Sequence, residues 1–237
     1  FVGEYNDVSA SVAVCDNKWH HAAFVYTGHA GGSKLSLYLD GAVVKEQYIS
    51  PLETTHSPLN IGWYPLYNAN GFHVGQLDSV YVYNTALTAA QIAEVYAKDA
   101  CPFPAPIAAY SFDGSLGSSL VDGLPLVASR PLEFGTGAPV YGFTADRCGR
   151  ANSALDMPSG ASTYFTAAVS GLPSGSGARS ATVWVRCAPT PDFETAFLQY
   201  GIRTSNHNSG LLNAHGSLHF VGEYNDVSAS VAVCDNK

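Results

Sequence analysis

The chain has 237 residues, of which 46% are hydrophobic and only 13% are charged, against about 25% charged residues in an average domain. Its formal net charge is −8 with 11 Lys and Arg residues, which argues against a nucleic-acid partner because such partners need clustered basic side chains. No apolar run approaches the roughly 18–20 residues of a membrane-spanning helix, so membrane insertion is not expected.

The first part of the chain predicts short strands and a hairpin. Residues 19–26 (WHHAAFVY) form a strand-like run. Residues 34–39 alternate apolar and polar side chains, and the Asp-Gly pair at 40–41 then predicts a tight turn into residues 42–44, which is a specific hairpin signal. Residues 74–83 predict a further strand. Abundant Gly, Pro and Tyr favour strands and turns over helices.

Only one segment predicts a helix. Residues 88–96 begin with a capping box formed by Thr88 and Gln91, in which each side chain bonds the backbone N–H of the other residue. The apolar residues of this segment fall on one helical face. Residues 101–106 (CPFPAP) follow, and three prolines in six residues end the helix and predict a stiff linker.

The second part of the chain continues the strand pattern. Residues 107–112 (IAAYSF), 181–187 (ATVWVRC) and 218–224 (LHFVGEY) each predict a strand. Short strands separated by turn signals are typical of an all-β sandwich.

The two ends of the chain have the same sequence. Residues 1–18 and 220–237 both read FVGEYNDVSASVAVCDNK, so that 219 residues (220 minus 1) separate equivalent positions. A polypeptide with a 219-residue period predicts this identity, and the alternative is a stretch duplicated by cloning or sequence assembly. Because solenoid repeats are only about 20–50 residues long, each 219-residue unit is predicted to be a whole domain.

The cysteines have to be counted within this period. Cys15 and Cys234 occupy the same position in it, which leaves four cysteines per unit. An even number without a C-x-x-C pair indicates two disulfides and an oxidising compartment instead of a zinc site. Four cysteines allow three pairings, and the sequence does not choose among them. We expect Cys187–Cys234, both at the ends of strand-like runs, with Cys101–Cys148; free buried thiols are the alternative.

Taken from residue 107 to 237 and then from 19 to about 99, the motifs of the chain resemble the laminin-G-like, concanavalin A-like jelly-roll family. Six motifs carry the resemblance: IAAYSFDGS with a following Asp-Gly pair (107–123), DRCGRANSALDMPSG (146–160), SATVWVRC (180–187), DNKWHHAAFVY (16–26), LYLDGAVV (37–44) and GQLDSVYVYNTALTAAQIAEVY (75–96). The resemblance implies an all-β, two-sheet antiparallel jelly-roll sandwich with one short C-terminal helix.

In this frame the chain holds parts of two repeats. Residues 1–100 correspond to the C-terminal part of one laminin-G-like repeat, residues 101–106 to the Pro-rich linker, and residues 107–237 to the N-terminal part of the next repeat. Either residues 19–100 dock back onto residues 107–237 of the same chain, or each half completes a neighbour. In both cases one copy of the repeated segment lacks a place in its own domain, and it is expected to fill that place in the next unit by strand addition.

The resemblance also implies a structural calcium ion. Laminin-G-like jelly rolls often hold one calcium between the first loop and the closing strand, and the matching positions are Asp113, Asp122 and Asp78. Oxygen-rich sites of this kind suit a hard cation. The alternative is that the Asp-Gly pairs at 113–114 and 122–123 are only turns.

No motif for catalysis is found. His20 and His21 in the Trp19-His20-His21 run point to opposite faces of a strand, so they are not expected to share a metal ion, and the family has this motif as a structural strand. The sequence lacks the nucleophile and zinc-protease motifs and the Glu-x-Asp-x-Glu strand of jelly-roll glycoside hydrolases. The domain is therefore predicted not to be an enzyme.

The loop at residues 62–72 is rich in aromatic residues. Trp63, Tyr64 and Tyr67 have three interpretations. They contact a neighbouring unit, because aromatic residues dominate interface hot spots; they stack on sugars, as in lectin-like relatives; or they cover one end of the core.

The function favoured by these patterns is a non-catalytic structural repeat of a long extracellular or cell-surface protein or filament. Its partners would be identical neighbouring repeats, because a head-to-tail contact that does not close into a ring builds a filament. The alternative is a carbohydrate-binding adhesin with glycan partners. A third hypothesis is an accessory domain of a larger hydrolase.

Overall fold

The structure is a computed structural model. It describes residues 14–28, 33–64, 71–98, 104–120, 123–131, 136–188, 194–202, 207–214, 216–222 and 227–229.

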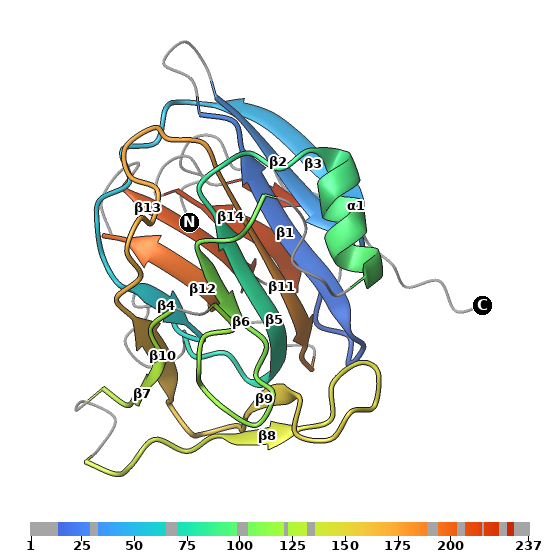
Figure 1. Cartoon of the computed structure of the whole chain (residues 1–237), viewed down its shortest axis with the longest axis vertical. Helices are drawn as coiled ribbons and strands as arrows, with labels where there is room; N and C mark the ends of the chain where they lie inside the picture. Colours follow the sequence, from blue (N-terminus) through green and yellow to red (C-terminus); the bar gives the residue numbers. More distant parts are fainter. Residues whose placement is uncertain are drawn as a thin grey trace.

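Two antiparallel sheets face each other across the core (Figure 1). Among the described residues, the first sheet has the order β3-β2-β1-β11-β5-β9-β8, with β6 also paired to β5, and the second has the order β15-β14-β13-β12-β4-β10-β7. The strands of the first sheet are β1 (His20–Tyr26), β2 (Ser33–Leu39), β3 (Ala42–Ile49), β5 (Gly75–Tyr83), β6 (Ala108–Tyr110), β8 (Gly142–Thr144), β9 (Ala154–Met157) and β11 (Arg179–Arg186). Those of the second are β4 (Leu59–Ile61), β7 (Val127–Ser129), β10 (Tyr164–Ala167), β12 (Glu194–Gly201), β13 (Asn208–Ala214), β14 (Ser217–Val221) and β15 (Val227–Ala229). The predicted jelly-roll sandwich is confirmed.

The two parts of the chain dock onto each other in one sandwich. Strand β11, from the second part, lies between β1 and β5 of the first part, with His21 opposite Trp184 and Leu77 opposite Val185. Of the two arrangements that the sequence left open, the structure therefore has residues 20–98 folded back onto the following segment. Whether the two parts come from successive repeats stays a prediction.

Local signals in the sequence predicted the local structure well. The Asp-Gly turn joins β2 to β3, and Asp40 and Gly41 have φ angles of 50° and 78°, as a two-residue hairpin turn requires. Helix α1 spans Ala89–Lys98. Its capping box is present, because the Thr88 N–H donates to Gln91 Oε1 at 2.8 Å and the Gln91 N–H donates to Thr88 Oγ1 at 3.2 Å.

Apolar side chains fill both faces of the first sheet. On the inner face Phe24 meets Phe220 of the second sheet edge to face, with ring centroids 4.8 Å apart. On the outer face α1 covers alternate residues of the same strands, and its Ile92 and Val95 pack with Val25 and Tyr83 (Figure 1). Because strand residues alternate between faces, this two-sided burial explains why β1 is apolar along nearly its whole length. Among the described residues, no helix has the length and apolar character needed to cross a membrane.

The two copies of the repeated segment contribute to different places in the sandwich. The first copy supplies Val14 and Cys15, which are buried in the core beside the start of β1. The second copy supplies Phe220 and Val221, at the end of β14, and the backbone of β15 at the sheet edge. Among the described residues, the two copies thus contribute different parts of the repeated segment to the sandwich.

The partner of Cys187 is Cys15, not Cys234 as predicted. The two cysteines occupy the same position in the repeat, and the correction follows from the docking of the first part of the chain, which brings the first copy beside the end of β11. Cys234 and Cys101 lie outside the described residues. Cys148, the predicted partner of Cys101, is an exposed free thiol.

Candidate functional site

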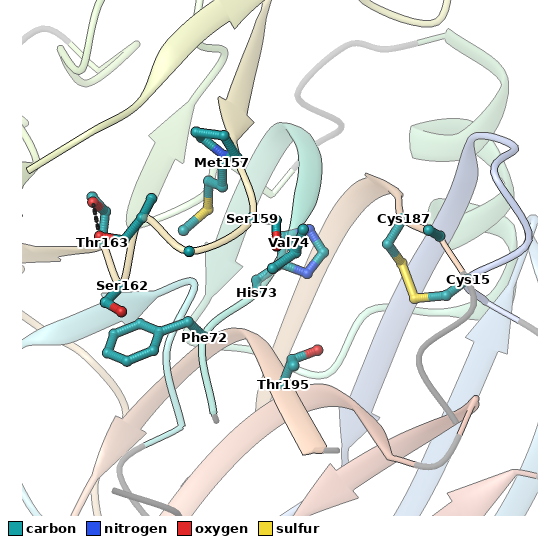
Figure 2. Close-up of a pocket in the computed structure, with 14 residues that line it drawn as sticks. Cys15, Phe72, His73, Val74, Met157, Ser159, Ser162, Thr163, Cys187 and Thr195 are labelled. Carbon is teal, nitrogen blue, oxygen red and sulfur yellow. Dashed lines mark hydrogen bonds between the residues drawn. A yellow bond between two sulfur atoms is a disulfide. The ribbon is translucent and has the colours of Figure 1, made fainter. Parts of the chain in front are cut away.

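A pocket of about 540 Å³ opens at the end of the sandwich where β9, β10 and β11 meet their loops. We call it the His73 pocket. Its walls are the loop from Met157 to Thr163, the segment Phe72–Val74, the Cys15–Cys187 disulfide and Thr195 at the start of β12 (Figure 2). The pocket thus lies between segments of both sheets.

A short antiparallel bridge positions His73. Trp63 pairs with Phe72, and the N–H of Tyr64 donates to the Gly71 carbonyl at 2.8 Å. The His73 N–H then donates to the Gly62 carbonyl, also at 2.8 Å. These bonds fix the backbone on both sides of the His73 ring, which lies between the Ser159 loop and the disulfide in Figure 2.

The His73 imidazole is only 2% exposed. One ring nitrogen interacts with the backbone of Gln76 through a hydrogen bond, and the other has no partner in the described part of the chain. Burial lowers the pKa of His73 to about 4, and the nearby backbone of Gln76 opposes only part of this effect. The ring is therefore neutral at physiological pH, with one donor and one acceptor nitrogen. Its nearest aromatic neighbour is Phe197, edge to face at 5.3 Å.

The close approach of β5 to β11 forms one side of the pocket. Gly75 has a φ angle of 139°, and a Cβ there would collide with the Arg186 carbonyl oxygen and lie against Cys187. Only glycine permits both this backbone conformation and this contact. The start of β5, which directly follows His73, is therefore held against the disulfide.

The predicted aromatic residues pack inward. Trp63 is half-buried and lies on Phe72 and Tyr164, with ring centroids 5.6 and 4.7 Å apart. Tyr64 is 2% exposed and packs with Leu212 and other residues of the second sheet. Their placement agrees best with the third interpretation, a cover over one end of the core. Tyr67 lies outside the described residues.

The predicted calcium ligands do not form a cation site among the described residues. Asp78 is fully buried, and its Oδ2 accepts a hydrogen bond from Arg147 Nη1 at 2.8 Å. A guanidinium at this distance competes with a metal ion for the carboxylate. Asp113 is exposed, and Asp122 lies outside the described residues. No group of three His, Cys, Asp or Glu side chains that could hold a metal is present in the described ranges, and with Asp122 outside them the calcium site stays a prediction.

The two histidines of the Trp-His-His run have separate structural roles. His21 is buried between Tyr96 and Trp184, at centroid distances of 5.9 and 5.4 Å. His20 is held between two carboxylates, with Nδ1 2.8 Å from Asp40 Oδ2 and Nε2 3.1 Å from Asp16 Oδ1. His20 therefore ties the Cys15 turn to the β2–β3 hairpin.

The His20 cluster predicts a pH dependence of stability. The hydrogen bond to Asp40 raises the pKa of His20 above 6.5, although burial opposes this. A raised histidine pKa stabilises the fold fully below the unfolded value, and the contribution is lost as the pH rises through the folded value. We therefore expect stability to fall between pH 6 and pH 8, by no more than about 1 kcal/mol because the cluster is partly exposed.

Asp40→Asn is the variant that checks this expectation, because Asn-Gly keeps the preferred turn and removes only the charge. Urea unfolding at pH 6, 7 and 8 should show a smaller pH dependence in Asp40→Asn than in the parent chain. An unchanged slope of stability with pH in this variant would mean that other groups cause the dependence.

Residues 2–93 match the family model described as the concanavalin A-like lectin/glucanases superfamily, a laminin-G-like model. The match covers β1 to β5 and the first half of α1, so the laminin-G-like resemblance is confirmed for this part of the chain. The described fold agrees with it in the remainder. No curated protein and no solved structure matches the chain. A domain of this kind is a carbohydrate-binding or structural module in general terms, and the superfamily description includes both lectins and glucanases.

Proposed function

We propose that this laminin-G-like jelly roll is a non-catalytic structural module of an extracellular protein, whose copies join head to tail by sharing the repeated segment. The observation that carries the proposal is the division of the segment between its two copies. Val14 and Cys15 of the first copy lie in the core, and residues 220–222 and 227–229 of the second belong to the second sheet of the same sandwich. The Cys15–Cys187 disulfide supports an oxidising compartment.

The sequences of these segments occur a second time in the chain. Residues 1–10 have the sequence of residues 220–229, and residues 233–237 have the sequence of residues 14–18. A neighbouring copy that lacks these parts has matching places for them, because the same sequence already fits there. Such an exchange adds the edge strand of one molecule to the sheet of the next, and its repetition builds an open array.

The exchange is tested with Cys15→Ser, which frees Cys187 for Cys234. Unlabelled and ¹⁵N-labelled chains of this variant are mixed in equal amounts, unfolded and reduced, refolded together under oxidising conditions and digested with trypsin. The Cys234 peptide begins at Thr204 and the Cys187 peptide ends at Arg203, so mass spectrometry identifies both. We expect the two peptides to be linked, with about half of the linked pairs carrying one labelled and one unlabelled member, as random pairing between chains gives.

The double variant Cys15→Ser/Cys234→Ser is the matched control, and it should give no such link. If all linked pairs carried a single isotope, with no mixed pairs, the link would close within one chain, which would contradict head-to-tail joining. Free thiols at Cys187 in the single variant would contradict it as well. Carbohydrate binding stays the alternative function, because the matched superfamily includes lectins.

A further inference from the structure

We propose that the His73 pocket is a binding site for a small, uncharged ring compound with one hydrogen-bonding group, and that this group pairs with the His73 imidazole. The site is independent of the head-to-tail joining proposed above. It rests on the lining of the pocket, on the one nitrogen of the His73 ring that has no partner in the described part of the chain, and on the apolar side chains around this ring.

The lining indicates an uncharged ligand. The described residues that line the pocket include no Lys, Arg, Asp or Glu. A charged ligand group would lose its hydration without gaining an opposite charge, which costs several kcal/mol. The volume of about 540 Å³ lies within the range of about 300–1,000 Å³ that is usual for small-molecule sites.

His73 indicates a ligand group that makes a hydrogen bond. Buried polar atoms in proteins nearly always have a partner, yet one ring nitrogen of His73 has none in the described part of the chain. The other nitrogen has the Gln76 backbone as its partner, and because this hydrogen bond raises the pKa of His73, the ring donates it. The ring itself lines the pocket. Since burial keeps the imidazole neutral, the remaining nitrogen accepts a hydrogen bond from a hydroxyl of the ligand.

The walls favour a flat apolar ring as the body of the ligand. Phe72 is 8% and Met157 2% exposed, and in Figure 2 they lie on different sides of the His73 ring, with the disulfide beyond it. A thioether and an aromatic ring both make favourable contacts with an aromatic ligand. The ligand class is therefore an aromatic alcohol or a compound of similar shape.

The test measures binding of 2-naphthol, naphthalene and 2-naphthoate to the full chain, by isothermal titration calorimetry at pH 7. We expect 2-naphthol to bind about tenfold more tightly than naphthalene, which is the effect of one hydrogen bond of about 1.4 kcal/mol. The naphthoate anion should bind most weakly. In His73→Phe, the preference for 2-naphthol over naphthalene should disappear, while naphthalene binding persists.

Two further measurements keep the result unambiguous. His56→Phe replaces an exposed histidine outside the pocket and should leave both affinities unchanged. The ¹⁵N chemical shifts of the His73 ring should move when 2-naphthol is added to the parent chain. The proposal is overturned if neither 2-naphthol nor naphthalene binds to the parent chain, or if the preference survives in His73→Phe. If the parent chain bound 2-naphthol and naphthalene equally, the proposal would be overturned as well, and His73 would be a core histidine that packs against Phe197.

Discussion

Arg179→Met is expected to lower the free energy of unfolding by about 2–5 kcal/mol, because it leaves several buried acceptors without their donor at about 1–3 kcal/mol each. Arg179 is fully buried at the start of β11. Its Nε donates to the Gly177 carbonyl at 2.8 Å and its Nη2 to the Gly175 carbonyl at 2.6 Å. Methionine has a similar apolar stem but no donor, so both carbonyls lose this partner.

The same guanidinium joins the two sheets. Its Nη1 donates to Ser209 Oγ of β13 at 3.0 Å, and the guanidinium lies 5.3 Å from the centre of the Tyr26 ring. Ser209 in turn contacts Thr54 at 3.0 Å. Loss of Arg179 therefore disturbs a chain of buried hydrogen bonds and not a single contact, and such networks lose more than the sum of their pairs.

Urea unfolding measures the effect, with Arg186→Met as the control at the other end of the same strand. Arg186 is exposed and makes one described hydrogen bond, to the Asn17 carbonyl, so its loss should cost at most about 0.5 kcal/mol. Arg179→Lys should lie between the parent chain and Arg179→Met, because one ammonium group cannot reach all the acceptors. A loss below about 1 kcal/mol in Arg179→Met would show that water replaces the guanidinium.

The sequence predicted those parts of the fold that local signals determine. The Asp40-Gly41 turn and the Thr88–Gln91 capping box depend on neighbouring residues only, and both are present. The long strands β1, β5 and β11 of the first sheet were also predicted as strand-like runs, whereas β12 and β13 of the second sheet were not. The short strands β7 and β8 were not predicted, because three residues at a sheet edge with partly exposed side chains carry no periodic pattern.

The candidate site was mostly invisible in the sequence. His73 belongs to no motif, and its environment arises from Met157, Cys187 and Thr195, which lie far away in the chain. For this reason His73 was not predicted as a site residue. The partner of Cys187 was missed in a different way. The correct position in the repeat was identified, but identical copies cannot be distinguished until the docking of the chain selects Cys15.

At Asp78 the resemblance identified an important buried residue, but the partner of its carboxylate in the structure is Arg147. The position was predicted as a calcium ligand, and its carboxylate is buried against Arg147. Arg147 also lies over the Trp184 ring, 4.2 Å from its centre, and Trp184 stacks on Tyr96 of α1 at 5.5 Å. Arg147, Trp184 and Tyr96 are therefore stacked in this order, and the stack holds the 146–153 loop on the outer face of the first sheet.

Arg147→Ala is therefore expected to destabilise the domain by about 3–5 kcal/mol, because it leaves a buried carboxylate without its cation. Asp78→Asn/Arg147→Ala should lose much less than the sum of the single changes Asp78→Asn and Arg147→Ala, since the double variant has neither charge. Urea unfolding of the parent chain, both single variants and the double variant gives the coupling energy of the pair. Additive losses would contradict this account.

A second experiment distinguishes the Asp78–Arg147 ion pair from a calcium site. A ligand that binds the folded state raises the melting temperature. Because the guanidinium already neutralises Asp78, calcium should not raise the melting temperature of the parent chain.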